Sequence, residues 1–356
     1  MAGVDRISVL PEEIKVSILF RLPSLSPMPS ARRLSPAPGV NSGPSSWSSC
    51  AGLPYFRLLQ DLKLFNVDIS LPSNFRGFEQ LTDLILYKVY ISQQDIQSLI
   101  NGSKKLRIIQ CFLLRDDGAP SLSVTFSCPS LEYICFRFYM NNAEVRIISA
   151  PCLEVAHVTA PLWSAPPELV WVGAAALKFL ADIAQVSYLS LSPYVLMGLS
   201  QVGVPHTLRF HQLRCLELSM ILSIDQTMHK VFCSLLRSML LLEILELTCY
   251  ESMESGKRLY ESDPILPDEY KKVDGYLCLN QTLRRVAISM ENLRGLKDLM
   301  WSIHFMFLNA NVLEVIRITY CNEDPMVKSR ILEDLRKVEK ASSDAQIVFV
   351  NVNDVS

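Results

Sequence analysis

Apolar residues recur along this chain in the pattern L-x-x-L-x-L, in which leucines or other apolar residues alternate with polar or mixed positions. The segment LLQDLKLFNVDI (58–69) aligns with QLTDLILYKVYI (80–91), and five apolar positions then coincide at a shift of 22 residues. The pattern starts again at Leu106, Leu131 and Leu153, after further steps of 25, 25 and 22 residues. Alternation of this kind predicts a short, half-buried β-strand at the start of each unit.

Weaker copies of the pattern follow, and they begin at Val186, Leu213, Leu242, Leu283 and Leu313. A period of roughly 20–29 residues with this motif indicates leucine-rich repeats. One unit cannot bury its own apolar face, whereas stacked units place the third and fifth residues after each starting leucine in one continuous core. The alternative is a leucine-rich globular α/β domain with accidental spacing. The regular steps between the first units argue against that alternative.

The rest of each unit is expected to return over the other side of the sheet, often as a helix. The segment SQQDIQSLINGS (92–103) predicts one such helix. Ser92 and Asp95 fit a capping box at its start, and Asn101-Gly102 is a stop signal at its end. Its apolar face is predicted at Ile96, Leu99 and Ile100.

The C-terminal quarter departs from the repeat and is expected to cap its end, which would otherwise expose the core. The predicted elements are a polar loop over 250–280, a strand over 283–288, a helix over 293–309, a strand over 313–319, a helix that starts at Asp324-Pro325, and a strand over 345–350. The buried sides of the two helices are predicted at Leu296, Leu299, Met300 and Ile303, and at Ile331, Leu332, Leu335 and Val338.

Side chains between the core positions of each strand are predicted to face outward. Leu86 should therefore be buried and its neighbour Tyr87 exposed. The outward set is Lys63, Phe65, Ile85, Tyr87, Ile108, Phe112, Tyr133, Arg137 and His157 in the first units, and Ser190, Glu217, Ser219, Glu246 and Thr248 in later ones. Aromatic residues and arginine are typical of binding hot spots. Tyr87, Phe112, Tyr133 and Arg137 are thus the candidate protein-binding patch, and the alternative is a register slip of one residue that buries these rings as core.

Composition and charge exclude several classes of function. A formal net charge of −2 leaves no basic excess to neutralise phosphates, so nucleic acid is not an expected partner. The ten cysteines are scattered without a Cys-x-x-Cys pair, which favours buried thiols in a reducing compartment over disulfides or a metal site. The most apolar stretch, 169–184, is short and contains Lys178 and Asp182, so no membrane span is predicted. These features indicate a cytoplasmic or nuclear protein.

No catalytic motif is present in the sequence. The chain contains neither His-Glu-x-x-His nor a P-loop nor Gly-x-Gly-x-x-Gly, and it contains only 13 glycines for phosphate-binding loops. The sequence therefore predicts neither an enzyme nor a cofactor. A hydrolase whose site residues are scattered along the chain is the least favoured alternative.

The N-terminal segment DRISVLPEEIKVSILFRLP (5–23) predicts an amphipathic helix, with Ile14, Ile18 and Leu22 on one stripe and Pro11 in its first turn. This segment resembles the first half of an F-box. The repeats, in particular LPSNFRGFEQLTDLILYKVYIS (71–92), resemble those of plant F-box/leucine-rich-repeat proteins. The segments LNANVLEVIRI (308–318) and SSDAQIVFV (342–350) resemble the FBD domain that ends many of these proteins.

The resemblance implies a substrate-recognition subunit of an SCF-type E3 ubiquitin ligase that acts in protein degradation. The F-box of such proteins docks on a Skp-type adaptor within a cullin-RING ligase, and the repeats hold a protein substrate. By this resemblance the adaptor-binding residues are Leu10, Pro11, Ile14, Ile18 and Leu22. The substrate itself is not identified.

The expected fold class is α/β: a leucine-rich-repeat solenoid with a short N-terminal helical F-box segment and a C-terminal α/β FBD cap. The corresponding domains are a partial F-box at 1–23, a disordered Pro/Ser-rich linker at 24–52, leucine-rich repeats at 53–277 and an FBD-like cap at 278–356. The F-box likeness is partial because prolines and glycines after Pro23 replace the family's next helix. The alternative function is a stand-alone protein-binding scaffold, or an inactive F-box relative, that does not recruit ubiquitin ligase.

Overall fold

The computed structural model describes residues 59–65, 68–71, 75–113, 123–137, 144–160, 166–221, 226–250, 275–293, 296, 299–322, 325–336 and 340–354. The chain divides into two compact units, Met1–Asp117 and Gly118–Ser356, called here the N-terminal unit and the C-terminal unit. The predicted adaptor-binding residues, the partial F-box at 1–23 and the linker at 24–52 lie outside the described residues.

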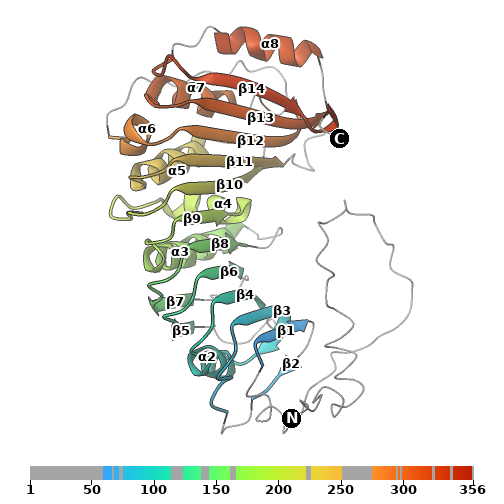
Figure 1. Ribbon diagram of the computed structural model, residues 1–356, viewed down its shortest axis with the longest axis vertical. Coiled ribbons are helices and arrows are strands. Elements are labelled where there is room, and N and C mark those ends of the chain that lie inside the picture. Colours follow the sequence, from blue (N-terminus) through green and yellow to red (C-terminus); the bar gives the residue numbers. More distant parts are fainter. Residues whose placement is uncertain are drawn as a thin grey trace, which may run out of the picture. The chain divides into compact units, whose positions relative to one another are not determined.

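The N-terminal unit contains a small parallel sheet with strand order β1-β3-β4, and β2 pairs with β3 (Figure 1). The strands are β1 (Asp61–Phe65), β2 (Asp68–Ile69), β3 (Asp83–Ile91) and β4 (Ile108–Leu113). Their register follows the sequence repeat, because Leu62 pairs with Leu84, and Leu84 pairs in turn with Ile109.

Helix α2 (Gln93–Gly102) is the return segment predicted from the sequence. The Ser92 hydroxyl oxygen accepts a hydrogen bond from the main-chain N–H of Asp95 at 3.1 Å, and this satisfies one of the free donors at the helix start. The three predicted core residues, Ile96, Leu99 and Ile100, are buried. Both the helix and its buried face are confirmed.

The C-terminal unit contains a larger parallel sheet with strand order β6-β8-β9-β10-β11-β12-β13-β14. The strands are β6 (Tyr133–Arg137), β8 (Val155–Thr159), β9 (Tyr188–Leu191), β10 (Cys215–Ile221), β11 (Ile244–Tyr250), β12 (Arg285–Asn292), β13 (Val315–Asn322) and β14 (Gln346–Asn351). The protein is therefore of mixed α/β class with a large parallel sheet, as the sequence predicted.

The sequence repeat sets the hydrogen-bond ladder of this sheet. The main-chain carbonyl of Ser187, the residue after the starting Val186, accepts from the N–H groups of Arg214 and Cys215 at 2.8 and 3.0 Å. The carbonyl of Arg214 accepts in the same way from the next unit. Equivalent residues of successive repeats therefore lie side by side. The third and fifth residues after each starting residue are buried in every repeat from the one that contains Leu84 to the one that contains Ile318.

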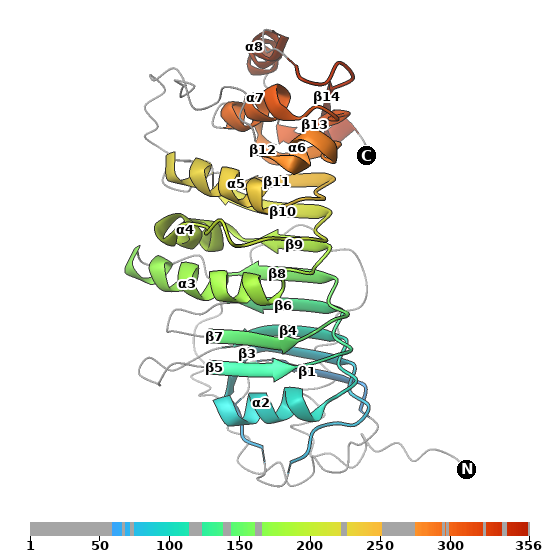
Figure 2. The ribbon, with the colours of Figure 1, turned by 90° about the vertical axis from the view of Figure 1, so that its left-hand side faces the viewer.

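Helices return the chain across one face of this sheet in most of the later units. They are α3 (Pro166–Asp182), α4 (Pro193–Val202), α5 (Gln226–Ser238), α6 (Leu277–Gln281), α7 (Met300–Asn309) and α8 (Pro325–Arg336). Figure 2 shows α3, α4 and α5 in front of strands β8 to β11. None of the described helices is long and apolar enough to cross a membrane.

Helices α3 and α4 approach closely because two glycines face each other at their crossing. A Cβ atom added to Gly173 would lie 2.1 Å from the carbonyl oxygen of Gly198. A larger residue at either position would force the helices apart.

Two return segments near β6 form strands instead of helices. Strand β5 (Ser123–Ser127) pairs in parallel with β7 (Glu144–Ser149) in a separate two-stranded sheet (Figure 2). Their sequences, SVTFS and EVRIIS, alternate β-branched or aromatic residues with polar ones, which favours a strand. Residues Val124, Phe126, Val145 and Ile147 are accordingly buried.

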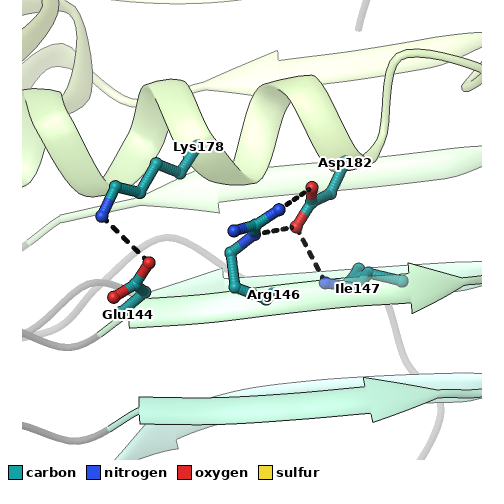
Figure 3. A network of polar contacts seen from close by, with 5 residues as sticks. All are labelled: Glu144, Arg146, Ile147, Lys178 and Asp182. Atoms are coloured by element: carbon teal, nitrogen blue, oxygen red, sulfur yellow. Dashed lines mark hydrogen bonds and ion pairs between the residues drawn. The ribbon is translucent and has the colours of Figure 1, made fainter.

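The last residue of α3, Asp182, forms polar contacts with β7 (Figure 3). Asp182 accepts two hydrogen bonds from the Arg146 guanidinium, at 2.7 and 3.1 Å, and one from the main-chain N–H of Ile147 at 2.9 Å. Lys178 and Glu144 form a second, more exposed ion pair at 3.0 Å. The carboxylate of Asp182 thus accepts a hydrogen bond from a main-chain N–H of β7 that would otherwise lack a partner in the protein.

The C-terminal elements differ from the sequence prediction in three details. Helix α7 begins at Met300 rather than 293, although the predicted core residues Leu296, Leu299, Met300 and Ile303 are all buried. Leu277–Gln281 form α6 at the end of the predicted loop 250–280, of which 251–274 lies outside the described residues. On α8, Ile331 and Leu335 are buried, whereas Leu332 is only half-buried, and Val338 lies outside the described residues.

Candidate protein-binding surface

The outward face of each sheet is formed by the side chains that alternate with the core positions. Leu86 is fully buried and Tyr87 is 37% exposed, so the predicted register is confirmed and a slip of one residue is excluded. In the C-terminal unit the described helices α3 to α7 lie on one side of the sheet, as both views show (Figures 1 and 2). The opposite face carries the outward side chains.

In the N-terminal unit three rings form a column across neighbouring strands. The centroids of Phe65 and Tyr87 are 6.0 Å apart, and those of Tyr87 and Phe112 are 5.6 Å apart. The register of the sheet pairs each ring with the next. Lys88, with φ of 53°, forms a bulge directly after this column. The bulge ends the aligned register at Tyr87.

In the C-terminal unit a second column runs over β6, β8 and β9. The ring centroids of Tyr133 and His157 are 5.3 Å apart, as are those of His157 and Tyr188. The Tyr188 hydroxyl donates a hydrogen bond to the Glu217 carboxylate on β10. Glu217 is paired in register with Glu246 on β11. The column of rings therefore leads to a pair of carboxylates.

The four predicted patch residues fall into two groups. Tyr87 and Phe112 stack in the N-terminal unit, whereas Tyr133 and Arg137 lie at the two ends of β6 in the C-terminal unit. The Arg137 guanidinium donates a hydrogen bond to the Thr159 hydroxyl at 3.4 Å. The rings other than Tyr87 are half-buried because they stack on one another, which the sequence pattern did not show.

Sequence reasoning missed Tyr188 in this surface. Tyr188 lies two residues after the starting Val186, just as Tyr133 lies two residues after the starting Leu131. This equivalence could have indicated that Tyr188 also faces outward. Only a comparison of that position across units would have aligned the two tyrosines.

Burial controls the protonation of this surface. It lowers the pKa of His157, and Glu217 opposes this only in part, so the imidazole is uncharged at neutral pH. Burial also raises the pKa of Tyr133 to about 12 and that of the Cys135 thiol to about 11. The surface therefore presents neutral rings and a protonated thiol, which is a poor nucleophile. Among the described residues, no group of three or more His, Cys, Asp or Glu is placed to hold a metal ion.

Residues 30–185 match the family model described as FBD-associated F-box protein At5g56370, LRR repeats. This part of the chain is similar to the leucine-rich repeats of F-box proteins. The match supports the resemblance of the repeats that was inferred from the sequence, whereas the F-box-like and FBD-like segments lie outside the matched residues. No curated protein and no solved structure matches the chain.

The leucine-rich-repeat match covers the strands from β1 to β8 and the whole of α3. All four predicted patch residues fall inside it, whereas Tyr188, Glu217 and Glu246 lie beyond its end at residue 185. The carboxylate pair is thus a feature of the repeats that follow the matched segment.

Proposed function

We propose that the protein is the substrate-recognition subunit of an SCF-type E3 ubiquitin ligase. The observation that supports this most is the match of residues 30–185 to the repeats of an FBD-associated F-box protein. In this proposal Leu10, Pro11, Ile14, Ile18 and Leu22 dock on a Skp-type adaptor, which links the chain to a cullin-RING ligase. The protein contributes no chemistry of its own, because ubiquitin is transferred by an E2 enzyme, and it acts in the cytoplasm or nucleus.

The repeats form a solenoid in this proposal, with 53–277 as its body and 278–356 as an FBD cap. The regular hydrogen-bond ladder of the parallel sheet supports this, because each unit contacts mainly its neighbours along the chain. In this proposal the outward faces of both units bind the protein substrate. The residues concerned are Tyr87 and Phe112 in the N-terminal unit and Tyr133 and Arg137 in the C-terminal unit. No nucleic acid or membrane takes part.

The second candidate is a protein-binding scaffold that does not recruit a ligase. The Pro/Ser-rich segment after Pro23, where an F-box would continue as helix, favours it. A pull-down of the full chain with a Skp-type adaptor separates the two. We expect the wild type to be retained and a Leu10→Arg/Ile14→Arg variant to be lost, because charges on the docking stripe oppose burial.

A Glu13→Arg variant is the matched control, since Glu13 falls on another side of the predicted helix. It should be retained like the wild type. If wild type and double variant are retained equally, or if neither is retained, the ligase proposal is wrong and the scaffold remains.

A further inference from the structure

Two glutamates lie side by side on the outward face of the C-terminal unit. Glu217 and Glu246 occupy equivalent positions on β10 and β11 and are paired in register. Neighbouring strands are about 4.8 Å apart, and like charges directly opposite each other destabilise a sheet. In the part of the chain that the structure describes, neither glutamate forms an ion pair, and Glu217 accepts only the hydroxyl of Tyr188.

Two other glutamates of this unit, which lie just before strands of the sheet, are paired with arginines of the neighbouring repeats. At the position after each starting residue, Arg214 forms an ion pair with Glu243, and Arg284 forms one with Glu314 at 2.7 Å. These residues belong to the same series of units as the carboxylate pair. Glu217 and Glu246 thus differ from these two glutamates in having no ion-pair partner among the described residues.

The neighbours of the two carboxylates are small. In the register of the sheet, Ser190 stands beside Glu217 on one side and Ala287 beside Glu246 on the other. Arg317 follows only after Ala287, on β13. Arg285 lies two residues before Ala287 on β12 and is exposed, so the outward surface is acidic over β10 and β11 and becomes basic from β12 onward.

An aromatic column adjoins the acidic pair. Tyr133, His157 and Tyr188 stack across β6, β8 and β9, and the hydroxyl of the last reaches Glu217. Aromatic faces attract cations, and arginine or lysine stems pack well on rings. Rings next to unpaired carboxylates are a suitable surface for a cationic side chain.

We propose that this surface, composed of Tyr133, His157, Tyr188, Glu217 and Glu246, binds a lysine- or arginine-bearing extended segment of a partner protein. The cationic head lies between the two carboxylates, and the rest of the segment crosses the column of rings. Charge complementarity selects this occupant, since an acidic segment would face two glutamates. This inference rests on the proposed role of the repeats in holding substrate and names the chemistry of that substrate.

The test uses the full chain and a short fluorescent peptide in which arginine alternates with serine. A peptide with glutamate in place of arginine is the probe of opposite charge. We expect the arginine peptide to bind and the glutamate peptide not to bind. A Glu217→Gln/Glu246→Gln variant should bind the arginine peptide about tenfold more weakly, because the desolvated charge contacts are lost.

A Glu243→Gln/Glu314→Gln variant is the matched control, since it removes the same two charges from the paired positions. It should bind the arginine peptide like the wild type. Equal weakening in both variants would show attraction to net charge only and would overturn the proposal, as would failure of the wild type to bind.

Thermal unfolding of the Glu217→Gln/Glu246→Gln variant and the wild type shows whether the two glutamates serve binding or the stability of the fold. Relief of repulsion between Glu217 and Glu246 should leave the Glu217→Gln/Glu246→Gln variant at least as stable as the wild type. A clear loss of stability would mean that the pair serves the fold. Retention on the Skp-type adaptor should not change in this variant, so failure of the ligase proposal and failure of this inference give different results.

Discussion

At the residue scale, Leu86 and Tyr87 are neighbours in β3 whose environments differ completely. Successive side chains of a strand point to opposite faces, so one is in the core and the other on the outward surface. Leu86→Ala should lower the free energy of unfolding by about 2–5 kcal/mol, as for other buried leucines. Tyr87→Ala should lower it far less. Urea denaturation of both variants measures this, and equal losses would contradict the assigned register.

His229 makes stability depend on pH. Its ring lies against the edge of Trp301 with centroids 4.0 Å apart, and burial lowers its pKa from 6.5 to about 4. The unfolded chain therefore binds a proton that the folded chain does not, between these two pH values. The stability that this histidine contributes is fully present above pH 6.5 and is lost as the pH falls toward 4.

We expect a His229→Gln variant to lose less stability than the wild type over that range. Unfolding by urea at both ends of the range measures the difference. His157 and His304 also have lowered pKa values and remain in the variant, so part of the pH dependence should persist. An equal loss in both proteins would show that His229 does not contribute.

At the element scale, α3 and β7 are joined by a small number of polar contacts. Asp182 holds both the Arg146 guanidinium and the Ile147 main-chain N–H (Figure 3). Asp182→Ala leaves that N–H without its partner and should lower the free energy of unfolding by about 1–3 kcal/mol. The more exposed Lys178–Glu144 pair provides the control, since Glu144→Ala should cost about 0–1 kcal/mol.

Hydrogen exchange at Ile147 gives a second measurement of this contact. We expect faster exchange in Asp182→Ala than in Glu144→Ala, because only the first variant removes the acceptor. Protection that is the same in both would mean that β7 does not depend on α3 at this point.

At the scale of the whole molecule, β14 covers the edge of the C-terminal sheet. It pairs with β13 over six residues from Gln346 to Asn351, and the β13 core residues Ile316 and Ile318 are fully buried. A chain that stops after Asn322 would leave the edge of β13 unpaired, and unpaired edges promote association. We expect it to melt at lower temperature and to self-associate in size-exclusion chromatography.

A chain that stops after Asp354 is the control, because it keeps β14 and the hydrogen bond from the Asn353 side chain to the Cys321 carbonyl. It should remain as stable and as monodisperse as the full chain. If the shorter chain behaves in the same way, the C-terminal block does not act as a cap.

The candidate surface was predictable only in part. The register placed Tyr87, Tyr133 and Arg137 on the outward side because their positions follow directly from the alternation of β-strand side chains. The contact between Tyr188 and Glu217 joins residues 29 apart in the sequence, and it depends on the direction in which a tyrosine side chain reaches across a strand. No local pattern contains that information.

The sequence alone determined where the strand of each repeat lies and which of its residues are buried, because a repeat of 22–25 residues places equivalent positions beside one another and alternation assigns their faces. Even the weak units from Val186 to Leu313 follow this rule. Only the tertiary structure showed that the return segments β5 and β7 are strands, that α7 begins at Met300, and that Asp182 accepts a hydrogen bond from the main chain of β7. These features depend on packing between distant segments, because a short apolar run can form either a strand or a helix and its own sequence does not distinguish the two.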